Sequence, residues 1–186
     1  MDTIELQRPG TWHFDQLDGL PDDGRRYEVG DGLLVVSPSP TFWHQAVSAV
    51  LLRQLSAQAP PGWHVLFELG LPLGTDGRVP DLSVVSARAP LRPEAPLPRP
   101  ELVGLVVEVV SPSSRKTDRF AKPGEYAEAG IPLFWRVETE PDLLLVAHML
   151  RGGVYEQVAV LDGAGTAPAP WGPVHVDLME VRRTSS

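Results

Sequence analysis

The stretch Leu105-Val106-Val107-Glu108-Val109-Val110 places one carboxylate inside a run of apolar residues. Continuous apolar runs rich in valine are typical of a strand whose two faces are both covered. Burying a carboxylate costs free energy unless a cation or hydrogen bonds compensate its charge. We therefore expect a central strand in which Glu108 is partnered by a metal ion, a basic side chain or a hydrogen-bond network. The alternatives are a purely structural ion pair and an edge strand on which Glu108 faces water.

A second carboxylate, Asp81, follows Pro80 and precedes another apolar segment, Leu82-Ser83-Val84-Val85. An aspartate in this position is also a common turn residue. If the two apolar segments form neighbouring strands, however, Asp81 and Glu108 lie close together, and Mg²⁺ or Mn²⁺ prefers such oxygen ligands. A zinc site has less support, because the chain has no cysteine and only five scattered histidines.

A basic segment follows Glu108 closely. Its four basic residues within eight positions are Arg115, Lys116, Arg119 and Lys122. Cationic side chains close to a helix N-terminus are typical of phosphate-binding sites. The alternative is a solvated basic turn without a ligand.

The rest of the sequence predicts a mixed β-sheet flanked by helices. Gly30-Asp31-Gly32 between two apolar segments indicates a hairpin, and apolar residues recur with helical spacing after Thr41. The expected elements are an N-terminal β-hairpin of Tyr27–Val29 and Leu33–Ser37, a helix over 41–59, strands over 63–73 and 79–86, a proline-rich loop over 88–100, a strand over 102–110, a helix over 120–129, strands over 133–137, 143–149 and 154–161, and a loop over 162–173. This order predicts an α/β or α+β fold in a single domain spanning 1–186, with a frayed tail over 182–186.

Composition excludes several classes of protein. Without cysteine, the chain has no disulfide scaffold and no thiol nucleophile. No basic and apolar leader is visible at Met1–Glu5, and no apolar run approaches the length of about 18 residues that a membrane span needs. We expect a cytoplasmic protein without a membrane partner. The net charge of −8 argues against broad coating of nucleic acid, but residues 78–136 carry 9 basic and 7 acidic groups and leave room for a compact phosphate site.

Several of these residues, with their spacing, form a recognisable set. The set consists of Pro80-Asp81, the segment 107–115 (VEVVSPSSR), Asp118-Arg119, Lys122, Tyr126, Gly130-Ile131-Pro132 and Phe134-Trp135, together with Tyr27-Glu28-Val29, Gly32, Ser37-Pro38 and His44. In this set the chain resembles the Uma-type restriction endonuclease family over roughly residues 14–160. The resemblance implies membership of the PD-(D/E)xK phosphodiesterase superfamily and a restriction-endonuclease-like fold, a mixed sheet flanked by helices.

By this resemblance, Asp81 and Glu108 are the two acidic residues of the site. They would hold Mg²⁺ or Mn²⁺ together with the main-chain carbonyl of Val109. The superfamily lysine normally follows the second acid by two positions, where this chain has Val110. The resemblance implies that Lys122 takes its place. Lys116 is the alternative, because Pro123 restricts Lys122 to the first turn of its helix.

The resemblance also implies roles around this centre. Glu28 and His44 would be additional ligands or proton-transfer groups, and Arg115, Lys116 and Arg119 would contact phosphates. The resulting hypothesis is a Mg²⁺-dependent endonuclease that hydrolyses DNA phosphodiester bonds and assembles as a homo-oligomer, a dimer or larger. The alternatives are a catalytically inactive nuclease-like binding module and a structural oligomer protein.

Overall fold

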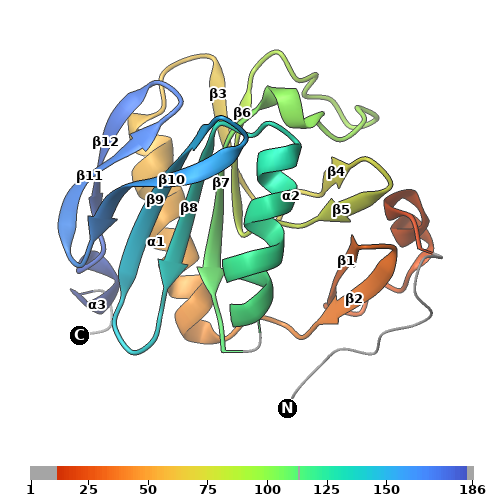
Figure 1. The fold of residues 1–186 in the computed structure, drawn as a ribbon, viewed down its shortest axis with the longest axis horizontal. Helices are drawn as coiled ribbons and strands as arrows, with labels where there is room; N and C mark the ends of the chain where they lie inside the picture. The colour runs from red at the N-terminus through yellow and green to blue at the C-terminus, as the bar shows by residue number, and fades with distance from the viewer. Residues whose placement is uncertain (1–11, 113, 184–186) are drawn as a thin grey trace.

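The computed structural model describes residues 12–112 and 114–183. A six-stranded sheet forms the centre of the fold, with helix α1 (Phe42–Gln58) on one face and helix α2 (Lys122–Glu128) on the other (Figure 1). In spatial order its strands are β10 (Val154–Leu161), β9 (Leu144–Arg151), β8 (Leu133–Glu138), β7 (Val103–Val110), β6 (Leu82–Ser86) and β3 (Trp63–Phe67). Strands β7 and β8 are parallel and the other neighbours are antiparallel. The expected mixed sheet flanked by helices is confirmed.

Two smaller β units accompany this sheet. A four-stranded sheet has the order β2 (Leu33–Ser37), β1 (Arg26–Gly30), β5 (Asp76–Arg78) and β4 (Leu71–Leu73). Its β1–β2 pair is the predicted N-terminal hairpin, and Asp31 and Gly32 adopt the positive φ values of 53° and 67° that such a tight turn requires. The other unit is a hairpin of β11 (Ala164–Ala169) and β12 (Gly172–Asp177). The short helices are η1 (Phe14–Gly19), η2 (Pro100–Leu102), η3 (Thr117–Ala121) and α3 (Glu180–Arg183).

Strand β7 is central, and all eight of its residues are buried. Leu105, Val107 and Val109 join the apolar cluster that includes α1. Val106 packs in the second cluster with Tyr126 of α2, and Glu108 projects to the same side. The strand is therefore covered on both faces, as its unbroken apolar sequence predicted.

Helix α1 begins after Thr41, whose hydroxyl oxygen accepts the backbone N–H of His44 at 3.2 Å. This N-cap satisfies one of the unpaired donors of the first turn. Val47, Leu51 and Leu55 lie on one helix face and are fully buried. No helix of the described residues is both long and apolar enough to span a membrane.

The segment 117–128 contains more helix than the sequence predicted. A π-helical turn, η3, leads directly into α2, and Gly130 follows the helix with φ 76°. Lys122 is the first residue of α2 and Pro123 lies in its first turn. The expectation that Lys122 lies at a helix N-terminus is wrong, because Ala121 before it is also helical and η3 continues into α2, so Lys122 lies within a continuous helical segment.

The loop predicted over 162–173 is wrong in part, because most of this segment belongs to the β11–β12 hairpin. Its glycine, alanine and proline content gives little strand propensity. Ala167 and Ala169 nevertheless bury their methyl groups in the core beside Val174 and Val176. Tertiary packing thus outweighs local preference in this hairpin.

The single strand predicted over 63–73 is also wrong. Strand β3 ends at Phe67, Glu68 adopts a positive φ of 48°, and Leu71–Leu73 form β4 in the other sheet. The predicted strand over 79–86 begins only at Leu82. At the C-terminus, Arg182 and Arg183 belong to α3 and do not fray, whereas 184–186 lie outside the described residues.

Candidate active site

Strand register brings the two predicted acids together. Strands β6 and β7 pair antiparallel with Leu82 opposite Val107. One step further along the same register, Asp81 comes opposite Glu108. The backbone N–H of Val109 donates to Asp81 Oδ2 at 2.7 Å, which ties the end of β7 to the residue that precedes β6.

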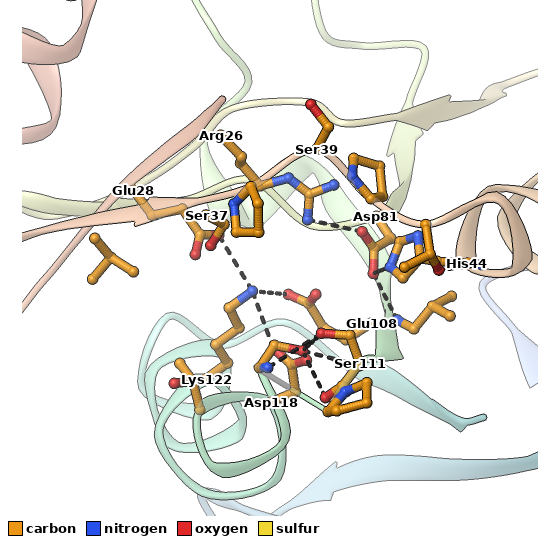
Figure 2. A pocket seen from close by; sticks show the side chains of 18 residues that line it. Arg26, Glu28, Ser37, Ser39, His44, Asp81, Glu108, Ser111, Asp118 and Lys122 are labelled. Carbon is orange, nitrogen blue, oxygen red and sulfur yellow. Dashed lines mark hydrogen bonds and ion pairs between the residues drawn. The ribbon is translucent and has the colours of Figure 1, made fainter. Parts of the chain in front are cut away.

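Asp81 is buried among three donors (Figure 2). Arg26 Nη1 donates to its Oδ1 at 2.8 Å, and His44 Nε2 lies 3.2 Å from its Oδ2, the oxygen that also accepts from Val109. Burial alone would raise the pKa of this carboxyl, but His44 and Arg26 outweigh burial and lower the pKa to about 2. Asp81 is therefore an ionised, rigidly held oxygen donor.

Lys122 lies among three carboxylates. Its Nζ is 3.1 Å from Glu108 Oε1, 3.3 Å from Glu28 Oε1 and 3.3 Å from Asp118 Oδ1. Burial lowers the pKa of the ammonium, but Glu108, Glu28 and Asp118 raise it well above its usual range. The side chain is consequently a permanent cation at neutral pH.

Glu108 differs from Asp81 in its surroundings, although both are buried. Its Oε1 accepts the Tyr126 hydroxyl at 2.6 Å and shares Lys122 with two other carboxylates. Burial raises the pKa of Glu108 to about 8 despite the neighbouring Lys122, and Asp118 and Asp81 add to the rise. A second cation close to this carboxylate would stabilise its charged form.

A buried arginine, Arg78, lies next to Glu28. Arg78 donates from Nε and Nη2 to the two carboxylate oxygens of Glu125, each at 2.6 Å, and its Nη1 lies 3.8 Å from Glu28 Oε2. Glu28 also accepts the backbone N–H of Val79 at 2.8 Å. Gly30 makes room for this arginine, since a Cβ there would lie 2.1 Å from Arg78 Nη2.

These residues surround one cavity of about 330 Å³ at the end of β7 (Figure 2). The residues that line it are Arg26, Glu28, Val35, Ser37, Pro38, Ser39, Pro40, Thr41, His44, Asp81, Glu108, Val109, Ser111, Pro112, Ser114, Thr117, Asp118 and Lys122. The structure thus brings together Asp81, Glu108, Lys122, Glu28 and His44, which the sequence singled out from distant segments.

The other predicted phosphate-binding residues do not line this cavity. Arg119 makes a two-fold contact with Glu138 at 2.9 and 2.8 Å, and Arg115 pairs with Glu140 at 3.2 Å. Lys116, the alternative to Lys122, is exposed and lies outside the cavity lining. Of the two lysines, only Lys122 contacts the acids of the site.

Three residues of the site received no role from the sequence: Arg26, Asp118 and Tyr126. Two simple periodicities could have indicated them. Arg26 precedes Glu28 by two positions on a strand, which places both side chains on one face. Asp118, Lys122 and Tyr126 recur at intervals of four, which places them on one side of a helix.

The acidic side chains of the cavity are possible ligands of a divalent cation. Among the described residues, no three His, Asp or Glu side chains are grouped as a metal site. Mg²⁺ needs fewer protein ligands, because one or two carboxylates suffice when water and substrate phosphate complete its coordination. Asp81, Glu108 and Val109 line one cavity, and their carboxylates and main-chain carbonyl are oxygen donors without sulfur. The chemistry of this donor set fits Mg²⁺ or Mn²⁺.

Comparisons with known proteins identify the fold and the family of the chain. In the solved structures, the chain is similar to a protein from Anabaena variabilis described as a putative nuclease of the DUF820 family, with a TM-score of 0.72 and 18% sequence identity over 91% of this chain and 96% of that one. This likeness shows a shared fold. No curated protein matches the chain. The family model of Uma2, described as "Putative restriction endonuclease", matches residues 13–172, and the chain therefore belongs to the Uma2 family.

Proposed function

We propose that the protein is a metal-dependent endonuclease that hydrolyses phosphodiester bonds of DNA with Mg²⁺ or Mn²⁺. The observation that carries the proposal is the convergence of Asp81, Glu108 and Lys122 on one cavity. The description of the Uma2 family as restriction endonucleases supports the reaction class. The description of the Anabaena protein as a nuclease agrees with it.

Asp81, Glu108 and the main-chain carbonyl of Val109 would hold the cation. When bound, the ion lowers the pKa of a coordinated water and neutralises charge on the scissile phosphate. Asp81 suits this role because its low pKa, about 2, keeps it ionised over the physiological range. His44 and the Val109 N–H hold its carboxylate in place from the protein side.

Lys122 serves as a cation and hydrogen-bond donor in this mechanism, and not as a general base. Its pKa is raised by three carboxylates, so the amine keeps its proton. The ammonium would orient the attacking water or stabilise the negative charge that develops on the phosphate oxygens. Glu28 forms an ion pair with Lys122 and accepts the backbone N–H of Val79, and so positions the ammonium.

The direct test is nicking of supercoiled plasmid DNA with Mg²⁺ or Mn²⁺ by wild type, Asp81→Asn, Glu108→Gln and Lys122→Met. Each variant should lose about 10²- to 10³-fold in rate, the usual effect of removing a charge-stabilising group. Lys116→Met is the matched control, because it removes the other lysine and leaves the cavity unchanged. Equal nicking by all preparations would identify a contaminating nuclease and contradict the proposal.

Calorimetric titration with Mn²⁺ distinguishes this enzyme from an inactive binding module. Wild type should bind the ion, and Asp81→Asn and Glu108→Gln should each weaken binding. A folded wild type that binds DNA but not Mn²⁺ would favour the binding module. We further propose that the active species is a homo-oligomer, which light scattering of the purified protein tests.

A further inference from the structure

We propose that Arg26 is the arginine that contacts a substrate phosphate, and that Asp81 and Glu68 hold it ready for this contact. The assignment rests on the proposed function. Arg26 lies in β1 and reaches into the cavity, where Nη1 donates to Asp81 Oδ1 and Nη2 to Glu68 Oε1, both at 2.8 Å. Figure 2 shows Arg26 beside Asp81 at one part of the cavity and Lys122 beside Glu28, Glu108 and Asp118 at another. A phosphate entering between Arg26 and Lys122 would meet a cation on each side.

Arg26 is more accessible than the other buried cations near the site. Its side chain is 17% exposed, against 4% for Lys122 and 4% for Arg78. Arg78 is held by both oxygens of Glu125, and Lys122 is surrounded by carboxylates. The guanidinium of Arg26 is planar and permanently charged, and its parallel N–H groups match two oxygens of a phosphate.

The contacts of Arg26 allow it to leave its present partners at low cost. A buried carboxylate that loses its only partner is strongly destabilised. Asp81 would keep His44 and the Val109 N–H after Arg26 turned to a phosphate. Glu68 has a side chain that is 39% exposed, so water can replace the arginine there. The same movement would free Asp81 Oδ1, which faces Arg26, for a cation.

This assignment predicts opposite effects on two ligands. Without Arg26, a DNA phosphate loses a charged donor, whereas Mn²⁺ loses a competitor for Asp81. The alternative is that Arg26 forms only a structural ion pair with Asp81. In that case the loss of Arg26 would disorder Asp81 and weaken Mn²⁺ binding as well, or would lower stability alone.

The experiment compares wild type with Arg26→Ala, Arg26→Lys and the control Arg25→Ala. Arg25 is the neighbouring arginine, lies 62% exposed and pairs with Asp23 outside the cavity. DNA affinity is measured by fluorescence anisotropy of a short labelled duplex, and of the same strand alone, with Ca²⁺ in place of Mg²⁺. Mn²⁺ affinity is measured by calorimetry without DNA, and plasmid nicking gives KM and kcat.

For Arg26→Ala we expect DNA affinity to fall about 10- to 100-fold, the range for losing hydrogen bonds to a charged group. Its KM should rise more than its kcat falls, and its Mn²⁺ affinity should equal or exceed that of wild type. The DNA affinity of Arg26→Lys should lie between those of wild type and Arg26→Ala, because lysine keeps the charge but lacks the two parallel N–H groups of the guanidinium. Arg25→Ala should stay within about threefold of wild type, as a surface cation with a small share of the salt-dependent attraction.

Two results would overturn the assignment while leaving the proposed function intact. One is wild-type DNA affinity and KM in a folded Arg26→Lys or Arg26→Ala protein. The other is a parallel loss of Mn²⁺ affinity. Circular dichroism and thermal melting establish folding, and Arg26→Lys decides the matter if Arg26→Ala does not fold. A wild-type protein that neither cleaves nor binds DNA would contradict both the function and the assignment.

Discussion

The buried charges on the two sides of the cavity have different kinds of partner. On the Asp81 side, Asp81 is surrounded by Arg26, His44 and the Val109 N–H. On the Lys122 side, Lys122 is the shared cation of Glu28, Glu108 and Asp118. Donors are in excess on the first side and carboxylates on the second. The opposite pKa shifts of Asp81, to about 2, and Glu108, to about 8, follow from this asymmetry.

The asymmetry indicates where a cation would relieve the most repulsion. A divalent ion between the two acids would meet an ionised Asp81 and convert Glu108 to its charged form. It would also reduce the repulsion among the carboxylates of the Lys122 side. Four variants, ordered by the size of the expected effect, test whether the two sides differ as described.

The largest effect on stability is expected for Lys122→Met. It leaves three buried carboxylates without their shared cation, and breaking a buried ion pair in this way costs about 3–5 kcal/mol. Urea unfolding followed by circular dichroism measures the loss. Adding Glu108→Gln to the same chain should restore part of it, because one ionisable group fewer then depends on the missing cation. A loss below about 1 kcal/mol would show that water already stabilises these carboxylates.

Tyr126→Phe should have an intermediate effect on the Lys122 side. It removes the hydroxyl that donates to Glu108 at 2.6 Å, and loss of a buried hydrogen bond costs about 1–3 kcal/mol. Tyr155→Phe is the matched control, since its hydroxyl donates to the Ile131 carbonyl at 2.7 Å, away from the cavity. Both changes should lower stability, but only Tyr126→Phe should reduce kcat. Equal kcat in the two variants would separate Tyr126 from the reaction.

His44→Gln should cost less stability on the Asp81 side, about 1 kcal/mol, because Arg26 and the Val109 N–H remain on Asp81. Thermal unfolding compares it with His175→Gln, which changes an exposed residue of β12. If His44→Gln destabilised the protein as much as Lys122→Met, Asp81 would depend on one partner as strongly as the three acids depend on Lys122, and the described difference between the two sides would be wrong.

Arg119→Ala should have the smallest effect. Its partner Glu138 lies outside the cavity and keeps a second cation, Arg136, whose Nε is 2.9 Å from Glu138 Oε1. DNA affinity, measured by anisotropy as for Arg26→Ala, should change by less than about threefold. A loss as large as that of Arg26→Ala would place the phosphate contact on η3 instead of β1.

The sequence predicted the centre of the site well because strong local signals lie there. Glu108 stands out within an apolar strand, and a proline and an apolar segment flank Asp81. Both residues could be found from their neighbours in the sequence, because the apolar segments beside them form adjacent strands of the sheet. The basic segment indicated Lys122 only as a possible phosphate contact, and its place beside the two acids came from the family resemblance, because its helix must pack on the sheet before the ammonium reaches Glu108.

The remaining parts depend on contacts that a local pattern does not contain. Arg26 meets Asp81 only because the β1–β2 hairpin lies against the end of β6. The β11–β12 hairpin forms because its alanines fill space beside α1, although their strand propensity is low. The predicted strand over 63–73 divides at Glu68, where the chain passes from one sheet to the other.

Lys122 comes from α2, whereas the acids come from the sheet, and this division has a mechanical consequence. The distance between Asp81 and Glu108 is set by backbone pairing, which tolerates little adjustment. The position of the ammonium depends on how α2 packs on the sheet, where Tyr126 of α2 contacts Phe134 of β8 with ring centroids 5.9 Å apart. A change of side-chain volume at this contact would move the Lys122 ammonium relative to Asp81 and Glu108, whose separation stays fixed. For the proposed reaction, this division means that substitutions in the core beneath α2, remote from the cavity, would change the position of the Lys122 ammonium without moving the two acids.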